Sequence, residues 1–545
     1  MSEADPVRAP ASAPAAGPVS AISEAQAARF LLRAQFSALE GEIAALRSRG
    51  YRAWLDAQFA SPRGQSGVDW LDAHGHNEIT AEARYFWPQG GDFMIWNQLL
   101  AQPDQMRQRM AFALSQFFVV SLNPIDGYWP PYIMAAWWGV LLDGAFGNFR
   151  DLLQHVTLNA GMGMYLNTKG NLKEDPATGR LPDENYAREI MQLFTIGLHE
   201  LNPDGTEKSG TGGQPIETYG QADVTNLARV FTGYDHDLIR VAYTNVAWQN
   251  FPVVSREFCL DPMRFDPGKH SMLEANFLGL RIPAGTPGPE KLRLALDHLF
   301  AHPNVGPFFG RQMIQRLVTS NPSPAYVRRV AAAFDDNGAG VRGDLKAVWR
   351  AVLTDPEALA PPDPQDRLSG KLREPVVRFV SWARSAGIHS ESGGYRIYDL
   401  SRSDTGLGQS PLRSPTVFNF YRPGYTPPHT AIAQAGRQAP EFQIHNETSA
   451  AGTINFLHWA LRTGYDDVKP TYAALLPLAH DPPALVAWLN LHLAADQLSN
   501  PTCRTIETAL ASMAVTAASS ESDKLDLLAS ACLLVMSAPE YLVQK

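Results

Sequence analysis

The stretch LPDENYAREIMQLFTIGL at residues 181–198 shows the pattern that decides the fold class of the whole chain. Pro182 and the acidic residues after it are typical of a helix start, where free backbone N–H groups favour proline and negative charge. Apolar residues then cover most of the circumference of a helix over 183–196. A helix that is apolar on most sides is buried in a large protein. The stretch therefore predicts a core helix.

The same periodicity recurs on both sides of this stretch, whereas strand-like alternation is confined to 239–243 and 395–398. Four segments rich in Gly, Pro, Asn, Asp and Thr (165–181, 201–219, 234–277 and 401–442) predict long ordered loops. We predict an all-α class, with orthogonally packed helices, long ordered loops and at most a few short strands. The further expected helices are 38–47, 51–59, 105–121, 149–159, 221–232, 290–302, 306–318, 324–334, 344–353, 374–385, 472–478, 483–493, 503–518 and 522–536.

Three regions are expected along the chain. Residues 1–22 form an Ala/Pro/Ser-rich tail that predicts disorder, 23–460 a helical core, and 461–545 a C-terminal helical segment packed on that core. The tail lacks the cationic start and apolar run of a secretory signal, which favours the cytoplasm. The apolar run at 133–142 is too short to span a membrane.

Composition narrows the functional classes. The chain has 545 residues, 45% of them hydrophobic and 19% charged, which is typical of a globular protein. A net charge of −9 argues against nucleic acid as the main partner. Cys259, Cys503 and Cys532 are too few and too scattered for a disulfide framework or a cysteine-based zinc site, and we expect buried thiols. The sequence leaves the oligomeric state open.

A narrow polar stripe on the 183–196 helix is the main candidate site. Glu184, Arg188 and Gln192 recur every four residues, with Asn185 and Glu189 alongside. We assign Glu184 and Glu189 to acid/base work or to a hard divalent cation, Arg188 to an anion clamp, and Asn185 and Gln192 to substrate binding. The alternative is a set of ordinary i,i+4 pairs, either solvated or buried as a structural network.

Neighbouring segments add candidates with alternatives of their own. Asp223 and Arg229 on the 221–232 helix are assigned to substrate binding, although Asp223 also suits the first turn of a helix. His270, in a long loop, is assigned as a proton shuttle, and the alternative is a structural histidine. Arg107 and Arg109 suit either anion recognition or surface exposure. The aromatic block 414–425 suits either a sugar-stacking platform or loop packing.

Common catalytic motifs are absent from the sequence: we find no Gly-x-Ser-x-Gly, phosphate-binding Gly-x-x-x-x-Gly-Lys or His-Glu-x-x-His pattern. Haem, nucleotide and zinc motifs are likewise not seen, so the cofactor is left unassigned apart from the divalent cation considered above.

Six blocks together resemble a bacterial family known as domain of unknown function 1800, and the resemblance runs from about residue 28 to near the C-terminus. It implies a helical protein, often encoded beside proteins that look like sulfatases and alkaline phosphatases. Since many members are exported, it also implies a cell-envelope or exported location. The blocks are MRQRMAFALSQFFVVS (106–121), LPDENYAREIMQLFTIGL (181–198), GQADVTNLARVFTGY (220–234), GKLREPVVRFVSWAR (370–384), GQSPLRSPTVFNFYRPGYTPP (408–428) and APEFQI (439–444).

One departure from the family pattern bears on activity. Members tend to read His-Asp-x-Gly-x-Lys before a Phe/Leu-Gly pair, whereas this chain keeps His270 but has Ser271 and Ala275 in place of the acid and the lysine. Two hypotheses follow. The first is a hydrolase-like enzyme with one buried polar site for an anionic or carbohydrate substrate. The second is a non-catalytic scaffold or binding protein for a sulfatase- or phosphatase-like partner.

Overall fold

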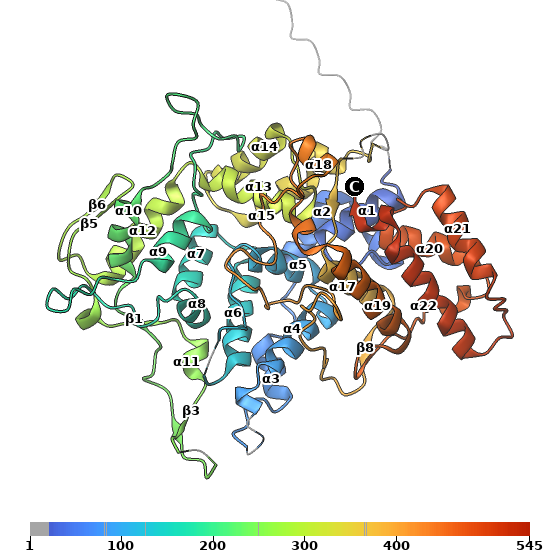
Figure 1. Cartoon of the computed structure of the whole chain (residues 1–545), viewed down its shortest axis with the longest axis horizontal. Helices are drawn as coiled ribbons and strands as arrows, with labels where there is room; N and C mark the ends of the chain where they lie inside the picture. Colours follow the sequence, from blue (N-terminus) through green and yellow to red (C-terminus); the bar gives the residue numbers. More distant parts are fainter. Residues whose placement is uncertain are drawn as a thin grey trace, which may run out of the picture.

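The computed structural model describes residues 21–545 except positions 81, 83, 126, 249, 364, 365 and 367. Most of the predicted tail at 1–22 therefore lies outside the described residues. The described chain is helical, with strands only as two-residue or three-residue pieces, which confirms the predicted fold class (Figure 1).

The helices of the first half run to α11. Their bounds are α1 Glu24–Ala34, α2 Glu40–Ala60, α3 Gly67–Ala73, α4 Gln89–Ala101, α5 Gln105–Ser115, α6 Pro130–Gly144, α7 Phe149–Leu158, α8 Ala160–Tyr165, α9 Asn185–Gln192, α10 Gln221–Ala228 and α11 Glu257–Leu260, with 3-10 turns η1 Arg84–Phe86 and η2 Arg229–Phe231.

The second half continues in the same manner. Its bounds are α12 Gly288–Ala301, α13 Val305–Leu317, α14 Pro324–Asp335, α15 Leu345–Thr354, α16 Pro356–Leu359, α17 Pro375–Ser385, α18 Ala431–Gln434, α19 Glu447–Thr463, α20 Pro482–Ala494, α21 Asn500–Ala511, α22 Glu521–Ser537 and α23 Pro539–Leu542, with η3 Pro267–Lys269, η4 Pro440–Ile444 and η5 Leu476–Leu478.

Ten short strands pair into five antiparallel two-stranded ribbons within the described residues. The pairs are β1 Tyr234–Asp235 with β4 Arg264–Phe265, β2 Tyr243–Thr244 with β3 Val253–Val254, β5 Ala275–Phe277 with β6 Leu280–Ile282, β7 Lys371–Leu372 with β10 Val543–Gln544, and β8 His389–Ser390 with β9 Val468–Lys469.

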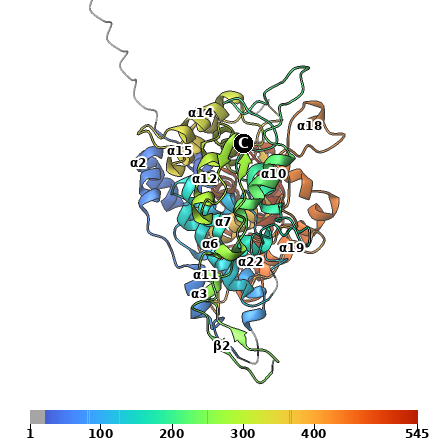
Figure 2. The ribbon, with the colours of Figure 1, turned by 90° about the vertical axis from the view of Figure 1, so that its left-hand side faces the viewer.

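The molecule is elongated, with α20, α21 and α22 at one end and α9, α10 and the β5–β6 ribbon at the other (Figure 1). The β2–β3 ribbon projects from the lower edge, as the side view also shows (Figure 2). A single hydrophobic core runs through the whole length, from Ala27 in α1 to Tyr541 in α23, and includes buried Trp96, Trp138 and Trp382. Its continuity explains why helices with so many apolar faces are stable: each packs on several neighbours.

Several predicted elements need correction. The helix expected over 105–121 ends at Ser115, after which Phe117 and Phe118 pack edge to face in an irregular segment. No strand forms at 395–398, because the local pairing partner of β9 is β8 at His389–Ser390. The helix expected over 472–478 is reduced to η5. The helices that were not predicted are α1, α3, α4, α6, α8, α11, α16, α18, α19 and α23.

The boundary predicted at residue 460 stays a prediction. Helix α19 crosses this position and packs on α22, and α20 packs on α1. Cys259 and Cys532 are buried as expected, and Cys503 is partly buried. No helix of the described chain is long and apolar enough to cross a membrane.

Candidate functional site

A cavity of about 680 Å³ opens between α13, the C-terminal end of α9, the segment 197–207 and the loop 417–426. Helix α13 forms its wall because its inner face is buried against α14 and α15 while Phe308, Arg311 and Gln312 remain on the cavity side. The volume suits a small-molecule ligand.

Positive charge dominates the lining. Arg311, Arg316 and Arg422 contribute to it, whereas Glu207 is its one carboxylate among the described residues. Arg311 Nη2 donates to Gln438 Oε1 at 3.2 Å, and Arg422 lies over the Phe418 ring at 4.8 Å. Such an excess of guanidinium groups favours an anionic ligand. Amides and aromatic rings complete the lining: Gln116, Gln192, Gln312, Gln315, Gln438, Phe117, Phe308, Phe418 and Tyr425.

The one lining carboxylate is held by a histidine. His199 Nδ1 lies 2.8 Å from Glu207 Oε1. A hairpin-like segment brings them together, since Leu201 forms a β-bridge with Glu207 and His199 forms one with Glu217. The carboxylate fixes the proton of the ring on Nδ1, so Nε2 is left as a proton acceptor, which is the arrangement of a general base.

Buried charges lie directly behind the cavity wall. Lys371 Nζ is 2.9 Å from Glu441 Oε1 and 3.7 Å from Glu374 Oε1, and all three side chains are at most 3% exposed. Glu374 Oε2 accepts from Gln409 Nε2 at 3.0 Å and also from the Nε2 of Gln116, which lines the cavity. Gln116 thus connects the carboxylate to the cavity.

The two buried carboxyls are pushed in opposite directions. Burial raises the pKa of Glu374, but Lys371, Arg109 and the amide donors outweigh it and hold that pKa below its ordinary value. Burial also raises the pKa of Glu441, and here Lys371 does not fully offset it because the charge of Glu374 adds to the rise. Environments that separate two carboxyl pKa values can support acid/base roles.

Arg109 and Arg316 extend this buried layer. Arg109 Nη2 donates to the Arg316 carbonyl at 3.1 Å, and Arg316 Nη2 donates to the Gln116 carbonyl at 2.9 Å. Nε and Nη1 of Arg109 and Nε of Arg316 have no hydrogen-bond partner. The layer therefore contains three cations (Lys371, Arg109 and Arg316) and two carboxylates (Glu374 and Glu441). Arg316 is the cation of this layer that lines the cavity.

The polar stripe predicted on α9 forms hydrogen bonds with α10. Glu184 accepts from Thr225 Oγ1 at 2.7 Å and Gln221 Nε2 at 2.8 Å, and its pair with Arg188 is 3.4 Å long. Glu189 is 9% exposed, its Oε2 has no partner, and burial raises its pKa. The backbone N–H of Asn185, the first residue of α9, donates a hydrogen bond to the Asp183 carboxylate. Gln192 is the one predicted site residue that lines the cavity.

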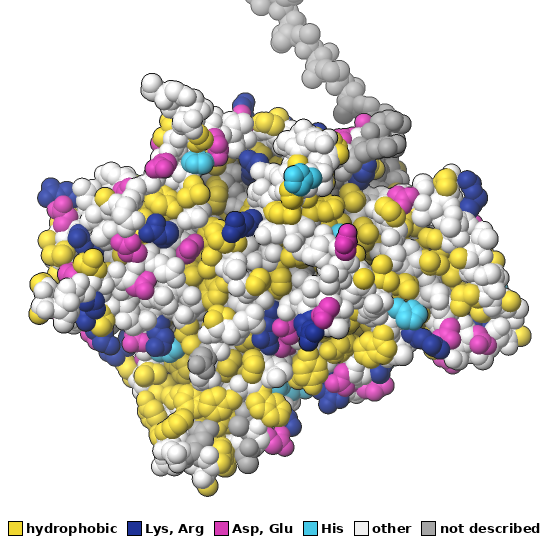
Figure 3. Space-filling model, viewed as in Figure 1, with side chains coloured by type: hydrophobic (Ala, Val, Ile, Leu, Met, Phe, Trp, Pro, Cys, Tyr) yellow, Lys and Arg dark blue, Asp and Glu magenta, His cyan; other side chains and the backbone are white. Residues whose placement is uncertain are grey.

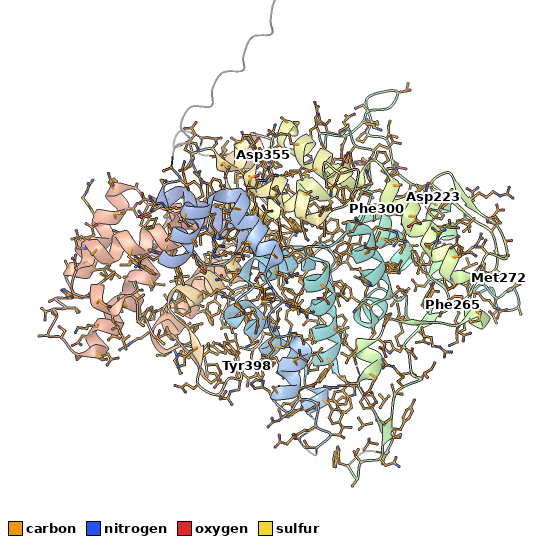
Figure 4. The ribbon with its side chains drawn as sticks, turned by 180° about the vertical axis from the view of Figure 1, so that it is seen from behind. Asp223, Phe265, Met272, Phe300, Asp355 and Tyr398 are labelled. Carbon is orange, nitrogen blue, oxygen red and sulfur yellow. The ribbon has the colours of Figure 1, made fainter. Side chains whose placement is uncertain are left out.

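Asp223, Arg229 and His270 lie away from the cavity lining. Asp223 accepts from the backbone N–H of Gly220 at 2.8 Å and of Leu278 at 2.7 Å, and Arg229 donates to the Glu274 carbonyl at 2.7 Å. Both therefore hold the β5–β6 ribbon against α10. Asp223 and Met272 lie at the same end of the molecule (Figure 4).

His270 is fully buried, with Nδ1 2.9 Å from the Thr232 carbonyl and Nε2 without a partner. Beside it, the buried Lys291 Nζ donates to the carbonyls of Ser271 and Leu273 at 2.7 and 3.0 Å. Lys291 of α12 thus binds the backbone carbonyls of the segment in which the sequence departs from the family pattern. The roles assigned to the stripe, to Asp223, Arg229 and His270 stay predictions. Within the described part of the chain, no group of three or more His, Cys, Asp or Glu could hold a metal ion.

Comparison with protein families identifies the chain. A family model described as protein of unknown function (DUF1800) matches residues 29–543. The chain belongs to this family. Comparison with curated proteins and with solved structures finds no match.

The DUF1800 blocks named above converge on the cavity and the charged layer. Residues 106–121 supply Arg109 and Gln116, 181–198 supply Gln192, and 370–384 supply Lys371 and Glu374. The blocks 408–428 and 439–444 supply further cavity and layer residues, among them Arg422 and Glu441. Block 220–234, which forms α10, does not reach the lining.

From the sequence, Gln192 was predicted to bind substrate, Arg109 was considered for anion recognition, and the aromatic block 414–425, which lines the cavity, was considered as a sugar-stacking platform. His199 and Glu207 were not predicted, because their pairing depends on the hairpin register of a loop. The sequence prediction was incomplete at the buried layer as well. It also missed Lys371, Glu374 and Glu441. Their signal was available: charged residues in blocks that otherwise read as buried need partners.

Proposed function

We propose that the cavity binds an anionic, hydroxyl-rich ligand of the sugar-acid class and that the chain hydrolyses it. The observation that carries the proposal is the lining of three arginines against one carboxylate, Glu207, which His199 already engages. Guanidinium groups bind carboxylate, sulfate or phosphate in a bidentate manner. The glutamine side chains match hydroxyl groups as both donors and acceptors, and Phe418 and Tyr425 offer faces to a sugar ring.

The hydrolytic step rests on His199. With Glu207 at Nδ1, Nε2 can take a proton from water as that water attacks an ester or glycosidic bond of the bound ligand, and the protonated ring then returns this proton to the departing alcohol oxygen. Arg311 and Arg316 would hold the anionic group and stabilise charge that develops beside it. The His199–Glu207 pair is one of the two acid/base elements at the site, and the other is the Glu374–Lys371–Glu441 layer behind Gln116.

Binding is tested with matched ligand pairs. Galacturonic acid against galactose, and glucose 6-phosphate against glucose, are compared by thermal unfolding and by calorimetry with the wild type and with Arg311→Gln. We expect the acid of each pair to bind at least tenfold more tightly than its neutral partner, and Arg311→Gln to lose most of that difference. Arg328→Gln, a surface arginine paired with Asp204, is the matched control. Equal affinity for both members of each pair would refute the proposal.

Turnover is tested separately from binding. His199→Gln keeps the size of the ring side chain but removes the proton acceptor, so we expect it to retain ligand affinity and to lose 100-fold or more in hydrolysis of nitrophenyl esters and glycosides of sugar acids. If wild type and variant hydrolyse a bound substrate at the same rate, His199 is not the base.

A second function, a binding scaffold, is favoured by a different surface. Tyr243 in β2 and Phe251 in the loop before β3 are 61% and 59% exposed, and Trp87 is 50% exposed. Hydrophobic side chains gather at this lower end of the molecule (Figure 3). Exposed aromatic clusters mark contact surfaces.

The sulfatase- or phosphatase-like neighbour that the family resemblance implies is the partner to test. If the chain is a binding scaffold, the purified neighbour protein and the wild type are expected to co-elute in size-exclusion chromatography. The double variant Tyr243→Ser/Phe251→Ser is expected to elute alone. If the cavity binds sugar acids without any turnover, the result would favour the scaffold hypothesis over the hydrolase hypothesis.

A further inference from the structure

A second, much smaller cavity lies where three distant segments meet: the end of α1, the first turns of α17, and the chain after α22. Its volume is about 10 Å³, which is room for about one water-sized sphere. The lining residues are Leu32, Phe36, Arg373, Val377, Arg378, Ser381, Tyr541 and Gln544.

Two cations line this cavity without a counter-ion. Arg373 and Arg378 are each 5% exposed, and neither forms an ion pair with a carboxylate of the described residues. Arg373 Nη1 donates to the Leu493 carbonyl at 2.5 Å, and its guanidinium lies over the Tyr541 ring at 4.8 Å. Burial lowers the pKa of Arg378 to about 10, and the nearby charge of Arg373 contributes to that shift. Buried charge without a partner is costly.

The unpaired polar atoms around the cavity share one chemistry. Nε of Arg373, Nε and Nη2 of Arg378, Oγ of Ser381 and Oη of Tyr541 are buried and have no hydrogen-bond partner. All five can donate a hydrogen bond, and the three guanidinium nitrogens can do nothing else. The hydroxyl groups of Ser381 and Tyr541 can also accept a hydrogen bond.

We infer that this cavity is a binding site for a halide ion, with chloride as the ligand that the Arg373 and Arg378 guanidinium groups and the Ser381 hydroxyl hold. A halide accepts every hydrogen bond offered to it and neutralises one of the two charges. A water molecule at this place would leave both guanidinium charges uncompensated, which is costly for buried groups. Phosphate, sulfate and carboxylate groups are too large for about 10 Å³.

This site is independent of the sugar-acid cavity, and its effect is on stability. Anything that binds the folded chain alone raises the unfolding temperature with the logarithm of its concentration. We expect a rise of about 1–2 °C for each tenfold increase in sodium chloride or bromide at constant ionic strength, made up with sodium methanesulfonate, whose anion does not fit.

Variants separate this site from the other arginines. Arg378→Met is expected to abolish the chloride dependence, and in chloride-free buffer to be at least as stable as wild type, because an unpaired buried charge is removed. Ser381→Ala is expected to shift the concentration at which chloride acts several-fold upward. Arg311→Gln, in the sugar-acid cavity, is expected to leave the chloride dependence unchanged. A chloride dependence that Arg378→Met leaves intact would overturn the inference.

A direct readout does not depend on any variant folding. Crystals of the wild type grown in sodium bromide are expected to give an anomalous difference peak between Arg373, Arg378 and Ser381. A refined water at that position with no anomalous signal would overturn the inference.

Discussion

At the scale of single residues, Glu374 and Glu441 differ although both are buried beside Lys371. Glu374 compensates Lys371 and Arg109, so Glu374→Gln leaves buried cations unpaired and is expected to destabilise the fold by about 3–5 kcal/mol at pH 7. Glu441 is less well compensated, and Glu441→Gln is expected to cost only about 1–2 kcal/mol. Urea unfolding of the two variants checks the order, and a larger cost for Glu441→Gln would contradict it.

The pH dependence of these variants also has opposite signs. The lowered pKa of Glu374 means that its stabilising contribution is present above its ordinary value of 4.5 and is lost as the pH falls through the lowered pKa. The raised pKa of Glu441 means that its contribution is present below 4.5 and is lost as the pH rises through the raised pKa. Between pH 5 and 7, the cost of Glu374→Gln should stay constant while that of Glu441→Gln falls. If the two costs changed with pH in the same way, the environments of Glu374 and Glu441 would not differ.

Residue-level prediction from sequence succeeded where local spacing carries the information. The i,i+4 pair of Glu184 and Arg188 forms, and Asp223 occupies the first turn of its helix, as the structural alternatives expected. Gln192 reaches the cavity, but Glu207 joins His199 across a loop. A contact of that kind depends on hairpin register, which residue spacing in a loop does not encode.

At the scale of elements, the kink in α2 depends on one glycine. Gly50 has φ +76° and ψ 161° inside the helix, a conformation that is essentially restricted to glycine. A Cβ there would meet nothing within 4 Å, so the cost of Gly50→Ala is purely conformational, about 1–3 kcal/mol.

Gly41 in the same helix is the matched control for this prediction. It also has open space around its Cβ position but a negative φ, so Gly41→Ala is expected to stabilise by about 0.4–1 kcal/mol. Both values come from urea unfolding. Similar effects for the two substitutions would show that the kink is not strained for alanine.

Helices were predictable from the sequence where one face is buried and the opposite face is exposed. Helices such as α14 and α15 alternate buried and exposed residues, and both were predicted. Helix α6 is buried nearly all round by α3, α4, α5 and α7, so it has no periodicity to detect. Helix α5 ends at Ser115 although apolar residues continue, because the following segment is buried by tertiary contacts and not by helix packing.

At the scale of the whole molecule, buried histidines set the acid limit of stability. Burial lowers the pKa of His76 and of His236 from 6.5 to about 4, and it lowers the pKa of His270 as well. A lowered pKa means that the stabilising contribution is present above 6.5 and is lost as the pH falls through the folded value. Each of the first two contributes up to about 3 kcal/mol.

We therefore expect the free energy of unfolding to fall steeply between pH 6.5 and 4, before most carboxylates are protonated. Urea unfolding at pH 7, 6, 5 and 4.5 measures this, and His236→Gln should make the curve shallower. Unchanged stability between pH 7 and 5 would contradict the assignment of these histidines as neutral.

The whole-molecule fold class followed from helical periodicity and from the scarcity of strands. The position of the site did not, because the cavity is assembled from α13, the end of α9 and two loops that lie more than 100 residues apart in sequence. The blocks that carry the family resemblance gave the better guide, since most of them meet at this cavity or at the charged layer behind it.

The central claim is that the arginine-lined cavity takes an anionic sugar, and a crystal structure with galacturonic acid tests it most directly. We expect density for the sugar in this cavity, with its carboxylate within hydrogen-bond distance of at least two of Arg311, Arg316 and Arg422. Density for the sugar elsewhere on the molecule, with only ordered water between these arginines, would contradict it.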